Sequence, residues 1–190
     1  MKRLLFFMIC VLTTLTSYSQ RYIPGQEGIQ VIASAVDGFH FEKDDKQAYS
    51  FSLAYSVYNK SQNRWVIGVD YLQKQFQYKD ILLPVSQFTG DIGFYKKILS
   101  DPSKTFFFSA GISGIAGYET TNWGKTLLFD GASIEDKGGF IYGGSFNTEI
   151  ETFITDRFVL IINAREKVLF GKPLNRFRFQ LGVGFKYIIN

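Results

Sequence analysis

The chain has 190 residues, of which 46% are hydrophobic and 17% aromatic, and its formal net charge is +4. This length fits one domain, and the charges are scattered without a basic stripe, which argues against direct nucleic-acid binding. The single cysteine, Cys10, excludes an internal disulfide and a cysteine-based metal site.

The first twenty residues, MKRLLFFMICVLTTLTSYSQ, have the order of a secretory signal peptide. Basic residues at 2–3 precede an apolar run over 4–15, and Ser19 supplies a small residue for cleavage. The run is too short for a membrane anchor. We therefore expect a cleaved signal peptide over 1–19 and one exported domain over 20–190.

Beyond this segment the hydrophobic pattern has a period of two, which is typical of strands. In YSFSLAYSVY, for example, Tyr49, Phe51 and Leu53 fall on one face, and Ser50 and Ser52 on the other. Several predicted strands exceed ten residues, and a tilted strand of about 9–11 residues can cross a bilayer. The pattern predicts strands over 28–36, 48–58, 64–74, 85–98, 105–118, 138–153, 157–169 and 175–189.

The predicted connections alternate in length along the chain. Longer polar loops are predicted at 37–47, 75–84 and 119–137, and short turns at 59–63, 100–104 and 154–156, with a further short connection at 171–175. Short turns on one side and longer loops on the other are typical of outer-membrane barrels. We predict an all-β fold, an eight-stranded antiparallel up-and-down outer-membrane β-barrel of the OmpA or OmpX type, with both termini in the periplasm.

A soluble β-sandwich would alternate as well, but the non-apolar face favours the barrel. It is built of small polar residues that suit the narrow lumen of eight strands, and its charges have both signs. Unpaired charges there would be costly, so pairing across the lumen is expected. The predicted structural charge network comprises Asp70, Asp91, Glu149, Glu151, Arg165, Arg176, Arg178 and Lys186.

The C-terminal stretch QLGVGFKY has the form of the signal that the outer-membrane insertion machinery recognises. A polar residue and a glycine, Gln180 and Gly182, precede two spaced aromatic residues, Phe185 and Tyr187. The chain ends at Asn190 rather than at an aromatic residue, which departs from many barrels.

Little in the sequence points to catalysis. The one histidine, His40, lies in the first long loop, and no serine stands in a nucleophile elbow. An exposed loop histidine is the simpler interpretation, although some small outer-membrane barrels modify lipid A with such a residue. We therefore predict no enzyme and no cofactor, and keep a lipid A-modifying barrel as an alternative.

Three stretches, QRYIPGQEGIQ, ETFITDRFVLIINAREKVLFG and FQLGVGFKYIIN, together resemble the TraO family of conjugal transfer proteins from conjugative transposons of Bacteroidetes. The resemblance implies an envelope component of the mating apparatus, with other transfer proteins as partners. The predicted barrel adds the outer membrane and its lipids. It supplies no catalytic residues. A soluble periplasmic β-domain that binds other transfer proteins remains a further alternative.

Overall fold

The computed structural model describes residues 22–37, 48–78, 81–124, 133, 138–173 and 175–190. The predicted signal peptide over 1–19 and His40 lie outside these residues. Within the described part of the chain, no helix is long and apolar enough to cross a membrane.

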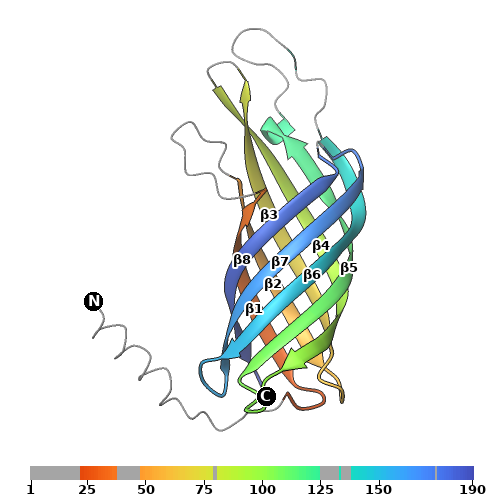
Figure 1. Cartoon of the computed structure of the whole chain (residues 1–190). Coiled ribbons are helices and arrows are strands. Elements are labelled where there is room, and N and C mark those ends of the chain that lie inside the picture. The colour runs from red at the N-terminus through yellow and green to blue at the C-terminus, as the bar shows by residue number, and fades with distance from the viewer. Residues whose placement is uncertain (1–21, 38–47, 79–80, 125–132, 134–137, 174) are drawn as a thin grey trace, which may run out of the picture.

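Eight antiparallel strands form one sheet that closes on itself (Figure 1). Each strand pairs with its neighbours in sequence, and the first strand pairs with the last. This confirms the predicted up-and-down barrel and excludes a sandwich of two packed sheets. The strands are β1 (Glu27–Val36), β2 (Ala48–Tyr58), β3 (Arg64–Tyr78), β4 (Ile81–Ser100), β5 (Phe106–Thr121), β6 (Gly138–Phe153), β7 (Phe158–Gly171) and β8 (Phe177–Ile188).

One predicted loop is wrong. Most of 75–84 belongs to a hairpin in which β3 and β4 stay paired as far as Tyr78 and Ile81. These two strands rise beyond the rest of the barrel, at the end opposite the C-terminus (Figure 1). The polar residues Gln75 and Gln77 suggested a loop, but 75–78 continue β3 and pair with 81–84 of β4.

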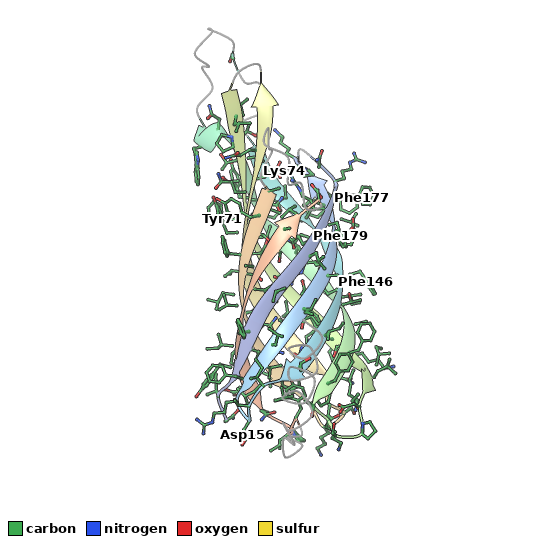
Figure 2. The ribbon with its side chains drawn as sticks, turned by 60° about the vertical axis from the view of Figure 1, so that its left-hand side comes forward. Tyr71, Lys74, Phe146, Asp156, Phe177 and Phe179 are labelled. Atoms are coloured by element: carbon green, nitrogen blue, oxygen red, sulfur yellow. The ribbon has the colours of Figure 1, made fainter. Side chains whose placement is uncertain are left out.

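The outer face of the barrel is strongly apolar. Trp65, Ile67 and Val69 of β3 are each more than half exposed, and the aromatic residues Phe146, Phe177 and Phe179 project outward in Figure 2. Such an extensive exposed apolar surface is rare on soluble monomers, whereas it suits a hydrocarbon environment. Closure leaves no sheet edge within this surface, so the strand backbone groups are paired.

Two glycines of β8 allow the barrel to close against β1. A Cβ atom on Gly184 would lie 2.2 Å from the Val31 carbonyl oxygen, and one on Gly182 would lie 2.2 Å from the Ser34 hydroxyl oxygen. By contrast, a Cβ atom on Gly114 of β5 would meet nothing within 4 Å. The pairing of β1 with β8 therefore requires glycine at 182 and 184, whereas position 114 of β5 has room for a side chain.

The turn between β4 and β5 is held by Asp101. Its Oδ1 accepts a hydrogen bond from the Phe106 backbone N–H at 2.7 Å, and its Oδ2 accepts one from the Ser103 hydroxyl. Slight burial opposes ionisation, but these hydrogen bonds outweigh it and lower the pKa of the Asp101 carboxyl. The ionised carboxylate thus stabilises the folded turn.

Candidate functional site in the barrel interior

Charged and polar side chains fill the interior, because every second residue of each strand points inward. The two ends of the barrel are marked in Figure 2 by Asp156 at one end and by Lys74 and Phe177 near the other. The rule that short turns face the periplasm predicts that the Asp156 end is periplasmic, and this end is called the periplasmic end. The interior charges form separate groups along this axis.

The group nearest the periplasmic end contains two cations and two carboxylates. Arg64 of β3 donates to both Glu149 and Glu151 of β6, and its separation from Glu151 is 3.1 Å. Lys186 of β8 donates to Glu151 and, at 2.7 Å, to the Tyr58 hydroxyl. All four charged side chains are at most 1% exposed, so the group is buried and neutral as a whole.

Two further ion pairs occupy the middle of the lumen. The ammonium of Lys167 lies 2.7 Å from Asp70. Arg165 donates through Nε to the Asn147 side-chain oxygen at 2.6 Å, and its guanidinium lies 3.6 Å from Asp91. Both pairs connect β7 to strands that are not its neighbours, so they tie opposite walls of the barrel together.

A third set lies toward the outer mouth. Arg178 of β8 donates to Glu119 of β5 at 3.1 Å, and Gln87 of β4 donates to the same carboxylate at 3.0 Å. Closer to the rim, Lys74 and Asp37 form a partly exposed ion pair at 2.5 Å. Each cation named in the lumen therefore has a carboxylate opposite it.

All of the predicted network residues except Arg176 are buried in the lumen. Arg176 is exposed and precedes the first residue of β8, Phe177, and its carbonyl accepts a hydrogen bond from the Leu169 N–H. Its inclusion was wrong because the strand begins one residue later. Three members were missed: Arg64, Lys167 and Glu119. The first two alternate with outward apolar residues, whereas Glu119 was assigned to a loop.

An aromatic cluster closes the periplasmic end below these charges. The ring of Tyr22, which precedes β1, stacks on Tyr58 with centroids 3.8 Å apart. Phe107 and Phe153 lie against the same ring at centroid distances of 5.0 and 5.1 Å. Because Tyr22 is only 3% exposed, the chain entering β1 forms part of a plug.

The predicted insertion-signal residues lie on β8 with two orientations. Gln180 and Gly182 are buried on the inner face, and Phe185 and Tyr187 are exposed on the outer face. Gln180 donates to the Ser50 hydroxyl at 3.1 Å. Among the described residues, no group of three or more histidine, cysteine or acidic side chains could hold a metal ion.

Comparison with solved structures identifies the class of this fold, that of small outer-membrane β-barrels. Neisserial surface protein A matches with a TM-score of 0.59 and 11% identity, covering 86% of this chain and 97% of that chain. Outer membrane protein OprG of Pseudomonas aeruginosa matches with a TM-score of 0.54 and 9% identity, covering 90% of this chain and 98% of that chain. Ail, the attachment invasion locus protein of Yersinia pestis, matches with a TM-score of 0.51 and 11% identity, covering 87% of this chain and 100% of that chain.

At such low identity these structures define the fold alone. A comparison with curated proteins finds no match. The family comparison, however, matches residues 23–189 to the family described as conjugative transposon protein TraO. The chain therefore belongs to the TraO family, as its sequence indicates.

Proposed function

We propose that this protein is an outer-membrane component of a conjugative transfer apparatus, with a structural or docking role in conjugal DNA transfer and no enzymatic activity. The observation that carries this proposal is the TraO family match over 23–189. Its partners are then outer-membrane lipids and other proteins of the apparatus, and it makes no direct contact with nucleic acid.

Export through a cleaved signal peptide over 1–19 and insertion into the outer membrane belong to the same proposal. The apolar outer face, exemplified by Ile67 and Val69, supports a lipid environment. The exposed pair Phe185 and Tyr187 at the end of β8 is accessible for recognition by the insertion machinery.

A docking role fits the interior better than a conducting one. Eight strands leave almost no aqueous bore, and here the bore holds buried ion pairs such as Lys167–Asp70. The plug around Tyr22 adds an apolar barrier at the periplasmic end. We infer that the charge network stabilises the folded barrel and that the loops and turns at its two ends bind the partner proteins.

The test is an in-frame deletion in a donor strain, complemented by a tagged copy of the full gene. We expect transfer frequency to fall on deletion and to recover on complementation, with the tagged protein in the outer-membrane fraction and heat-modifiable on gels. Unchanged transfer in the deletion strain would remove the proposed role. A changed lipid A profile in that strain would instead favour the lipid-modifying alternative.

A further inference from the structure

The periplasmic end carries a hollow of about 390 Å³ beside the aromatic plug. Its walls come from the turn between β2 and β3, the end of β4, the turn between β4 and β5, and the segment preceding β1. Three lysines line it, Lys60, Lys97 and Lys104, together with Gln62 and Ile23. These elements are distant in sequence, so the fold gathers the three ammonium groups around one opening.

Hydrogen bonds between the walls shape the hollow in advance. The Lys97 backbone N–H donates to the Asn63 side-chain oxygen at 3.0 Å, and the Lys97 ammonium donates to Gln62 at 2.6 Å. Gln62 and Lys104 both have left-handed backbone conformations, with φ of 61° and 55°. Lys97 at the end of β4 is therefore fixed against the turn between β2 and β3, while Lys60 and Lys104 are carried by the two turns.

No carboxylate of the described chain neutralises these lysines. Asp101 is in the same turn as Lys104, but its oxygens accept hydrogen bonds from Phe106 and Ser103, and it forms no ion pair with the three lysines. Deeper in the barrel, Arg64 and Lys186 are balanced by two glutamates. Among the described residues, the three lysines at the mouth of the hollow therefore have no ion-pair partner.

We propose that this hollow docks an acidic segment of a periplasmic partner protein, with carboxylates of the partner contacting Lys60, Lys97 and Lys104. The inference rests on the proposed function, for which it names a surface and a partner chemistry. A protein segment is favoured over a lipid head group because Lys60 and Lys104 lie in turns at the end of the barrel, outside the strands that carry the apolar outer face. Ile23, 61% exposed, offers an apolar contact beside the charges.

Binding is measured with the full mature chain folded in detergent, using a fluorescein-labelled hexaglutamate peptide as the probe and hexaglutamine as its neutral counterpart. The test variant combines Lys60→Gln, Lys97→Gln and Lys104→Asn, because asparagine accepts the left-handed backbone at 104. The control combines Lys96→Gln, Lys172→Gln and Arg176→Gln, which removes the same charge from exposed sites outside the hollow.

We expect hexaglutamate to bind the unaltered protein in preference to hexaglutamine, and added salt to weaken the binding. The test variant should lose about tenfold in affinity at low ionic strength, and the control variant less than about twofold. Equal binding of both peptides, or equal loss in both variants, would overturn the proposal. So would salt-sensitive binding to phosphatidylglycerol vesicles that exceeds binding to the peptide and depends on the same lysines.

Folding of each variant is checked by heat-modifiable migration on gels. If the triple test variant does not fold, the single variant Lys60→Glu, which lies in an exposed turn, replaces it. Mating assays then separate this inference from the proposed function. If deletion abolishes transfer but the test variant restores it fully, the docking inference fails and the function stands. If deletion leaves transfer unchanged, the function fails whatever the peptide binds.

Discussion

Arg64 is the cation whose removal should cost the barrel most. It lies between Glu149 and Glu151, is 1% exposed, and its guanidinium carbon also lies 4.8 Å from the centre of the Tyr95 ring. We consider Arg64→Met, which retains much of the length and the apolar stem of the side chain while removing the charge. Lys186 would then face two buried carboxylates alone.

Removing one partner of a buried ion pair typically costs about 3–5 kcal/mol, because the remaining charge stays desolvated without compensation. We expect a loss of this size in the free energy of unfolding for Arg64→Met. Adding Glu149→Gln restores neutrality, so the double variant should lose less than the sum of the two single losses by at least about 1 kcal/mol.

The assay is urea unfolding of the barrel in lipid vesicles, followed by tryptophan fluorescence and by heat-modifiable migration. Arg176→Met is the matched control, since Arg176 is exposed and should cost no more than about 0.5 kcal/mol. An Arg64→Met loss no larger than that of Arg176→Met would refute the buried neutral group. Strict additivity with Glu149→Gln would show that the two side chains do not interact.

Three further outcomes can be checked by the same unfolding assay. Gly184→Ala should destabilise the barrel by more than about 2 kcal/mol, because its Cβ would overlap the backbone of β1. Gly114→Ala, with open space around its Cβ, should cost less than about 0.5 kcal/mol. Similar losses for the two variants would refute close packing between β1 and β8. Glu166, half-exposed on the outward face of β7 and paired in register with Phe146, should be replaceable by leucine with a gain of up to about 1 kcal/mol, and a clear loss would contradict a lipid-facing position. Because the folded pKa of Asp101 is lowered, its stabilising effect should be present above its unfolded pKa and fade as pH falls through the folded pKa. Asp101→Asn should therefore destabilise the protein at pH 7, and the difference should shrink as the carboxyl becomes protonated at acid pH; a pH-independent difference would refute this origin.

The sequence predicted the barrel well because alternation reports directly which face of a strand a residue occupies. The observed ends of β2 and β6 coincide with the predicted ranges 48–58 and 138–153. The prediction failed over 75–84, where polar composition suggested a loop, whereas these residues continue the antiparallel pairing of β3 and β4.

Partners across the lumen could not be read from the sequence in the same way. Alternation places Arg64, Asp70 and Lys167 inside the barrel. The level of each side chain along the barrel axis, and therefore its partner across the lumen, depends on the stagger of the strands around the closed barrel. That stagger is a property of all eight pairings together. Glu119 illustrates the limit, because its pairing with Arg178 depends on β5 extending to Thr121.

The division between a neutral interior and charged rims has a consequence for experiments on function. Changes inside the lumen, such as at Arg64, act on the folding equilibrium, so they should reduce transfer only through the amount of folded barrel. Changes at Lys60 and Lys104 leave the buried ion pairs intact, so any effect on transfer must appear with normal amounts of folded protein. Measuring the amount of folded barrel and the transfer frequency together for both classes of variant therefore distinguishes residues that stabilise the fold from residues that bind a partner.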